Sequence, residues 1–301
     1  MNKKIIAIIF ALVAAIFYSI STPFSKIMLE DVSSTMMAAF LYLGAGIGMG
    51  IIFLLTKQYK CDNKLNKKDL PYTFGMIILD ILAPIFLMIG LVSCSSSSAS
   101  LLNNFEIVAT TLIALILFKE KVSTKLWIGI ILITISSFIL SFNSVTDMEL
   151  TKGSIFVLLA TCCWGLENNC TRSISDKNTY QIVTVKGLFS GLGSLIIALI
   201  LKDNIPDLIN IIKILSLGFI AYGLSIFLYV KAQKFLGASK TSAYYAVNPF
   251  IGSFLSFIFL KERLSINYVW GLLIMIIGSI FVIIDTLNTK NVEEESVNEI
   301  S

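Results

Sequence analysis

The sequence predicts an all-α membrane protein in which ten transmembrane helices form two inverted repeats of five helices each. Three observations support this prediction. Of the 301 residues, 56% are hydrophobic and only 14% are charged, whereas soluble domains carry about 25% charged residues. Ten segments are apolar enough to cross a bilayer, and two similar turns recur at matching places in the two halves of the chain. So little charge cannot cover a water-soluble surface of this size, so lipid must surround most of the chain.

Ten segments reach the length of about 20 mainly apolar residues that a membrane-spanning helix needs. They are residues 5–28, 34–55, 71–92, 98–118, 124–142, 153–173, 179–201, 211–231, 240–260 and 266–286. The first follows Asn2-Lys-Lys4, like a secretory signal, but it reaches about Thr22, meets Pro23 and lacks an A-x-A cleavage pattern. We therefore expect an uncleaved first span.

Two similar turns indicate that the chain is a duplication. Phe118-Lys-Glu-Lys-Val-Ser123 ends the fourth segment, and Leu260-Lys-Glu-Arg-Leu-Ser265 ends the ninth. Each half then holds five spans, and because five is odd the second half inserts upside down. We predict a first repeat over residues 1–146, an inverted second repeat over 147–287, and a disordered acidic cytoplasmic tail over 288–301.

The distribution of basic residues predicts the orientation. With the N-terminus in the cytoplasm, sixteen Lys and Arg residues lie in cytoplasmic segments, six lie on the opposite side, and Lys186 lies inside a span. Cytoplasmic loops carry an excess of these residues, so both termini should be cytoplasmic. Frequent Lys and Ile with little Arg is typical of a prokaryote with an AT-rich genome, so we expect the cytoplasmic (plasma) membrane.

Composition also argues against several classes of function. The chain has no His, which removes the usual general base and the commonest metal ligand. Its five Cys show no paired C-x-x-C spacing, so we expect small apolar helix residues rather than a metal site or disulfides. A net charge of +4 without a basic stripe argues against nucleic acid. We expect no cofactor, a small-molecule substrate and the lipid bilayer as partners, and a monomer or homodimer.

Several local patterns resemble a known family. Each half has an apolar run, a Lys-Glu turn and a last helix that contains glycine. The second half fits best, with Asn248-Pro249 and Leu260-Lys-Glu-Arg263, and Trp164-Gly165 fits the start of a half. The first half departs from the pattern at Tyr18-Ser19 and at Glu106-Ile107. Because these patterns occur in this order over ten spans, the chain is similar to the EamA-type transporters of the drug/metabolite transporter superfamily. The resemblance implies movement of small organic metabolites, including amino acids, without ATP hydrolysis.

Four charged residues lie deep inside predicted spans, where a charge costs about 2.5–3.5 kcal/mol or more and usually faces a cavity or a partner. The first is Asp80, some nine residues into the third span, with Pro84 one turn later. The offset between the two Lys-Glu turns pairs Asp80 with Tyr222 in the eighth span. This correspondence favours a position beside a substrate cavity for both residues.

Glu106 is the strongest functional candidate. It lies about eight residues into the fourth span, roughly 12 Å along the helix at 1.5 Å per residue, and Asn103 lies on the same face one turn earlier. Glu106 could bind the amine of a substrate or carry a coupling proton, with Asn103 as a neighbouring amide ligand. A structural ion pair or a hydrogen-bonded carboxylic acid is the alternative.

Glu167 and Lys186 lie at similar depths in the sixth and seventh spans. They could pair, which would reduce the desolvation cost of both. Lys186 could instead hold a substrate carboxylate, or release Glu167 when substrate arrives. The sequence leaves these interpretations open.

Aromatic and amide side chains lie at related positions in the two halves. Trp164 and Asn168 share a face of the sixth span, and Tyr18 is the counterpart of Trp164 in the first span. Tyr245 and Asn248 share a face of the ninth span. An aromatic wall with a few polar groups is typical of a binding pocket, so we expect these residues to contact substrate.

Together these patterns predict a secondary transporter rather than an enzyme. We expect it to export amino acids or related compounds by alternating access around the residues named above, with Glu106 carrying the proton. An intramembrane lipid-modifying enzyme is one alternative, although H-E-x-x-H and G-x-S-x-G patterns are absent. A non-transporting membrane receptor or assembly subunit is the other.

Overall fold

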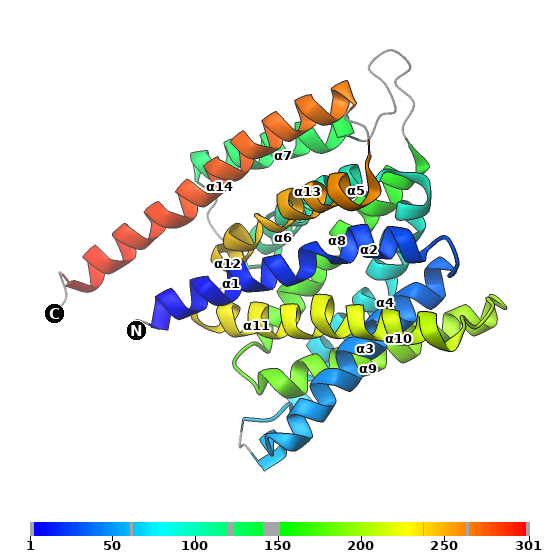
Figure 1. Cartoon of the computed structure of the whole chain (residues 1–301). Coiled ribbons are helices and arrows are strands. Elements are labelled where there is room, and N and C mark those ends of the chain that lie inside the picture. Colours follow the sequence, from blue (N-terminus) through cyan, green and yellow to red (C-terminus); the bar gives the residue numbers. More distant parts are fainter. Residues whose placement is uncertain are drawn as a thin grey trace.

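The computed structural model describes residues 3–60, 63–118, 123–140, 151–236, 238–262 and 265–298, and the regular elements of these residues are all helical (Figure 1). Within these described residues, six helical segments are long and apolar enough to cross a membrane: Ile5–Met28, Ser34–Leu55, Lys67–Ser93, Thr179–Ile200, Leu208–Leu236 and Ile266–Asp285. The apolar helices Thr124–Leu140 and Asn248–Leu260 are shorter. The predicted class of an all-α membrane protein is confirmed, while the count of ten spans stays a prediction.

The helices follow one another with short connections. The first half contains α1 (Lys3–Ser19), α2 (Ser21–Met28), α3 (Ser34–Leu55), the short turns η1 (Gln58–Lys60) and η2 (Lys67–Asp69), α4 (Leu70–Ser93), α5 (Ser96–Leu102), α6 (Phe105–Phe118) and α7 (Thr124–Leu140). The second half contains α8 (Lys152–Ser173), α9 (Thr179–Ile200), α10 (Leu208–Gly218), the π-helical segment η3 (Phe219–Leu224), α11 (Ser225–Leu236), α12 (Ala238–Tyr245), α13 (Asn248–Leu260) and α14 (Ile266–Asn298). Helix α14 continues to Asn298, into the segment that we predicted to be disordered.

Three of the predicted spans are divided into two helices, which the sequence analysis did not anticipate. The fourth span breaks at Asn103-Asn104 and the ninth at Ala246-Val247, where α13 begins with Asn248-Pro249. The first span breaks at Ile20, shortly before the Thr-Pro pair in α2. Proline fits the first turn of a helix, and asparagine competes with the helical backbone for hydrogen bonds, so both favour a break. Each break places a helix N-terminus inside an apolar segment.

The bounds of the helices recur along the chain. Helices α12, α13 and α14 begin nearly the same number of residues after α5, α6 and α7 as the second Lys-Glu turn lies after the first. Helices α3 and α9 are also equal in length, with 22 residues each. A Cβ atom added at Gly129 would lie 2.7 Å from Val282 Cγ2, and one added at Gly271 would lie 2.6 Å from Leu140 Cγ. By the offset between the two turns, Gly271 is the counterpart of Gly129 and Val282 is the counterpart of Leu140. The same contact therefore occurs twice, with the roles of the two halves exchanged.

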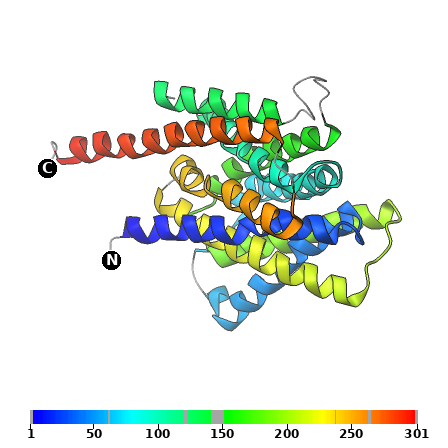
Figure 2. The same cartoon turned by 45° about the horizontal axis from the view of Figure 1, so that its top comes forward.

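Two pairs of corresponding helices form opposite edges of the molecule. Helices α7 and α14 lie side by side at one edge in both views (Figure 2), and α3 packs against α9 at the other. The approach of α3 and α9 is very close, because a Cβ atom on Gly187 would lie 2.4 Å from the backbone nitrogen of Gly46. Between the two edges, α1 packs against α11 and α4 packs against α8. Asp80 on α4 and Glu167 on α8 lie in this central part, and Lys186 on α9 contacts both of them.

The second Lys-Glu turn has a structural role in the fold. Glu262 accepts hydrogen bonds from the backbone nitrogens of Ser96 (2.7 Å) and Ser97 (2.9 Å), so it caps the N-terminus of α5. Lys26 donates to the carbonyl oxygen of Cys94 (3.0 Å) at the end of α4. The corner between α4 and α5 is therefore bound by charges from elsewhere in the chain. Glu120, the predicted counterpart of Glu262, lies outside the described residues.

Candidate functional site

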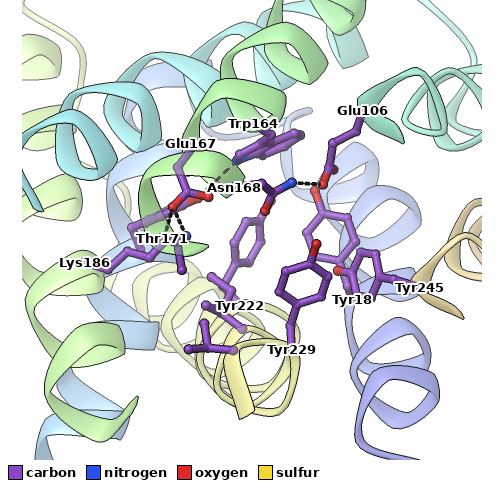
Figure 3. A pocket seen from close by; sticks show the side chains of 13 residues that line it. Tyr18, Glu106, Trp164, Glu167, Asn168, Thr171, Lys186, Tyr222, Tyr229 and Tyr245 are labelled. Atoms are coloured by element: carbon purple, nitrogen blue, oxygen red, sulfur yellow. Dashed lines mark hydrogen bonds and ion pairs between the residues drawn. The ribbon is translucent and has the colours of Figure 1, made fainter. Parts of the chain in front are cut away.

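A small cavity lies among helices from both halves of the chain (Figure 3). Its volume is about 50 Å³, which is room for a few water molecules. Most of its lining is aromatic or charged: Tyr18, Tyr42, Glu106, Trp164, Glu167, Asn168, Thr171, Lys186, Tyr222, Ile226, Tyr229, Val230 and Tyr245. These residues come from α1, α3, α6, α8, α9, η3, α11 and α12, so the cavity is the place where the central helices converge.

One side of the cavity holds a buried group of three charges. Lys186 Nζ lies 2.9 Å from Glu167 Oε1 and 3.0 Å from Asp80 Oδ2. The side chains of Lys186, Glu167 and Asp80 are 5%, 3% and 0% exposed, so neither ion pair is screened by water. The pairing of Glu167 with Lys186 is the arrangement that the sequence left open, and Asp80 joins it. Opposite charges in contact offset the large cost of burying each one alone.

Hydrogen bonds extend this charged group. Asp80 accepts a bond from the hydroxyl of Tyr42 at 2.9 Å, and Tyr42 accepts one from the indole nitrogen of Trp164 at 3.4 Å. Glu167 accepts a bond from the hydroxyl of Thr171, one turn later on α8. The group therefore fixes α3, α4, α8 and α9 relative to one another.

Glu106 lies on the opposite side of the cavity from Lys186 (Figure 3). It stands in the first turn of α6, where the helix dipole favours a negative charge. Its Oε1 accepts a hydrogen bond of 2.6 Å from Asn168 Nδ2, which also lies 3.3 Å from Thr110 Oγ1. No described lysine or arginine forms an ion pair with Glu106.

Tyrosine rings form much of the wall. The ring of Tyr18 lies at the centre, with centroid distances of 5.3 Å to Tyr222, 6.0 Å to Tyr245 and 6.2 Å to Trp164. Tyr245 also lies 5.0 Å from Tyr229. Their hydroxyl groups find partners in the neighbouring helices: Ser21 donates to Tyr222 (3.1 Å), and Tyr229 shares a bond of 2.7 Å with Ser242. The wall is therefore ordered by both ring packing and hydrogen bonds.

A second, smaller cavity adjoins the first, because Glu106 and Tyr245 line both. Asn103 and Asn248 line this second cavity, whose volume is about 10 Å³. Asn103 Oδ1 is buried there and has no hydrogen-bond partner among the described residues. The two divided helices, α5–α6 and α12–α13, therefore present their broken ends next to Glu106.

The structure brings together ten of the eleven residues that the sequence analysis selected. Eight line the main cavity: Tyr18, Glu106, Trp164, Glu167, Asn168, Lys186, Tyr222 and Tyr245. Asn103 and Asn248 line the adjoining one. Asp80 does not line either cavity, because it lies fully buried beyond Lys186.

Sequence reasoning missed Tyr42, Thr171 and Tyr229 as lining residues. Thr171 follows Glu167 by one helical turn and Tyr229 follows Tyr222 by two, so helical spacing could have identified both. Tyr42 has a weaker signal, a single tyrosine in an otherwise apolar and glycine-rich span. Within the described residues, no cluster of His, Cys, Asp and Glu has the arrangement of a metal site.

Known proteins resemble this chain over most of its length. The family model described as the EamA-like transporter family matches residues 5–142 and 151–284. An uncharacterized transporter of Methanothermobacter thermautotrophicus is 26% identical over 284 residues, which cover 88% of this chain and 82% of that protein. An uncharacterized transporter of Clostridium kluyveri is 27% identical over 289 residues, covering 90% and 91% of the two chains. A solved crystal structure with 12% identity covers 93% of this chain and 96% of its own, with a TM-score of 0.70, which shows a similar fold.

Proposed function

Because the chain belongs to the EamA-like transporter family, it is a membrane transporter, and we propose that it exports small organic metabolites, such as amino acids or related compounds, by alternating access. The family and these relatives are described as transporters, which agrees with the expectation of a transporter rather than an enzyme. The nature of the solute, the direction of transport and the coupling of transport to protons are parts of this proposal.

The observation that carries the proposal is the cavity with charged walls between the two halves. Glu106 comes from the first half, whereas Glu167 and Lys186 come from the second. Charged side chains inside a membrane are costly and usually mark a solute or ion pathway. A site at the junction of two repeats can open to one side of the membrane and then to the other when the halves tilt.

Several features support the inverted repeat on which alternating access depends. The same family model matches two successive segments of similar length. The starts of α12, α13 and α14 repeat those of α5, α6 and α7, and α3 packs against its counterpart α9. Residues 5–142 and 151–284 would then be the two moving units.

The size of the cavity indicates which state this structure represents. Pockets that hold small molecules usually have volumes of about 300–1,000 Å³. The cavity of about 50 Å³ cannot accept an amino acid without movement of its walls. We infer that the cavity is too small for a solute in the described conformation, and that substrate enters when helices separate.

Glu106 is the proposed carrier of the coupling proton. It has no partner of opposite charge among the described residues, so a bound proton or a bound substrate would relieve the cost of its charge. Asp80 and Glu167 differ from it, because both already contact Lys186. We assign to Asp80 the role of positioning Lys186 rather than of touching the solute.

Transport itself is tested by flux across sealed liposomes. Purified protein would first be screened for metabolites that raise its unfolding temperature, and each positive compound would then be loaded, in labelled form, into proteoliposomes. We expect at least one compound to leave proteoliposomes faster than it leaves protein-free liposomes. If none of the stabilising compounds crosses the membrane any faster, the protein is not their transporter and the proposal fails.

A further inference from the structure

We propose that the solute is an organic monocation, namely an amine or a substituted ammonium without a carboxylate, and that Glu106 binds it within the tyrosine wall. This inference rests on the proposed transport function and, among the related compounds named there, selects amines in place of amino acids. It follows from the charges that line the cavity, the groups beside Glu106 and the state of Lys186.

The balance of charge in the site is negative. The site and its immediate support contain three carboxyl groups, Asp80, Glu106 and Glu167, and one ammonium group, Lys186. Lys186 lies against two of the three carboxylates, which leaves Glu106 without a counter-ion among the described residues. A cationic ligand at Glu106 would reduce the uncompensated charge, whereas an anionic ligand would increase it.

The groups around Glu106 suit a cation. Tyr18 and Tyr245 lie on the same side of the cavity as Glu106, and Trp164 stands between that side and Lys186 (Figure 3). The faces of tyrosine and tryptophan rings attract ammonium groups, most strongly when water is excluded. A carboxylate combined with several aromatic rings is therefore a suitable surface for an ammonium and its hydrocarbon substituents.

Hydrogen-bonding groups next to Glu106 include a free acceptor. Asn103 Oδ1 is buried in the adjoining cavity without a partner among the described residues. An ammonium group carries up to three donors and no acceptor, so it could bond to both Glu106 and Asn103. Among the described residues, the donor that contacts the Glu106 carboxylate is Asn168 Nδ2, at 2.6 Å.

The state of Lys186 disfavours a zwitterion. The carboxylate of an amino acid would need a cation, and Lys186 is the one described cation that lines the cavity. Its Nζ lies 2.9 Å and 3.0 Å from two carboxylate oxygens, so a third carboxylate would approach a group that is already negative overall. An amine should therefore bind better than the amino acid that has the same side chain and an additional carboxylate.

The test compares each amino acid with the amine that lacks its carboxylate and with the acid that lacks its amino group. Three series would be used: ethylamine, alanine and propionate; isoamylamine, leucine and 4-methylpentanoate; phenethylamine, phenylalanine and 3-phenylpropionate. Dissociation constants would be measured from the shift in unfolding temperature of the purified full-length protein, in phosphate buffer free of amines at constant ionic strength. In at least one series we expect the amine to bind at least tenfold more tightly than the amino acid, and the acid not to bind.

Variants of Glu106 locate the binding. Glu106→Gln keeps the shape of the side chain but removes its charge, so amine affinity should fall at least tenfold, whereas Glu106→Asp should retain amine binding. Glu30→Gln, at an exposed position, is the matched control and should bind as the unaltered protein does. If Glu106→Gln does not fold, the comparison within each series and the Glu106→Asp variant still decide the question.

Two results would overturn the inference. One is that the amino acid binds as tightly as its amine in every series. The other is that no amine binds, or that the affinity for amines is unchanged in Glu106→Gln. Flux is measured separately, so the two proposals can fail independently. Glu106-dependent export of amino acids would keep the transport proposal and reject this one, while amine binding without flux would do the reverse.

Discussion

At the scale of single residues, Lys186 shows how buried charges are shared. It is the one described cation that lines the cavity, and Asp80 and Glu167 both contact it from different helices. The sequence revealed all of these residues, because charges are rare in apolar spans. It did not reveal the three-way contact, because that depends on how α4, α8 and α9 are rotated about their axes.

Removing the central cation of this group should destabilise the protein. Lys186→Met leaves Asp80 and Glu167 buried without a cation, so the free energy of unfolding should fall by about 3–5 kcal/mol. The triple variant Asp80→Asn, Glu167→Gln, Lys186→Met replaces all three charges by neutral groups of similar size and should recover much of that loss. Unfolding of the purified proteins in detergent measures both effects. A Lys186→Met variant as stable as the unaltered protein would contradict the role assigned to the ion pairs.

At the scale of helices, the positions of the continuous segments were largely predictable. Both ends of α3 and of α9 lie within one residue of the predicted bounds. The length of the hydrophobic segment and the N-cap residues, Ser33 and Asn178, indicate the same bounds there. The breaks within the fourth and ninth spans were missed. Hydropathy stays high across both breaks, and the signals for them are a pair of asparagines and one Asn-Pro step.

The breaks matter for the site. Each ends one short helix and begins another, and the positive end of the α6 dipole lies next to Glu106. A continuous helix would have placed Glu106 in the middle of a helix, without this dipole. The position of Glu106 at the start of α6 is therefore as important for the site as the carboxylate itself.

Close contact between α3 and α9 depends on glycine. A Cβ atom on Gly187 would lie 2.4 Å from the backbone nitrogen of Gly46, so Gly187→Ala must push the two helices apart and should lower stability by about 1–3 kcal/mol. Gly50→Ala on the same helix pair is the control, because its Cβ atom would meet the Thr184 methyl group at 3.3 Å, where a small shift suffices. Thermal unfolding distinguishes them. Equal losses for the two variants would argue against a backbone contact that limits this interface.

At the scale of the whole molecule, two short turns were enough to predict a repeat. The register that they define also relates the start of α5 to that of α12 and the start of α7 to that of α14. What the sequence could not supply is the way the halves meet, because contacts such as Gly129 with Val282 and Gly271 with Leu140 become visible only in three dimensions. The turns themselves belong to the frame, since Glu262 caps α5.

In the proposed mechanism, the cavity is the route of the solute, and Glu106 is the place where proton and solute exchange. The two halves of the chain provide different charges to this one cavity, because Glu106 comes from the first half and Glu167 and Lys186 come from the second. Export coupled to proton entry requires that proton and solute occupy Glu106 in turn. The coupling should therefore vanish when this carboxyl group can no longer hold a proton.

The most direct test is efflux driven by a pH gradient in proteoliposomes. The solute should be one that the protein transports and that carries a permanent charge, so that it cannot cross as a neutral base. With an acidic exterior, the unaltered protein and Glu30→Gln should release it several-fold faster than without a gradient, whereas Glu106→Gln should show no acceleration although it folds. Acceleration by the gradient that persists in Glu106→Gln would contradict the account.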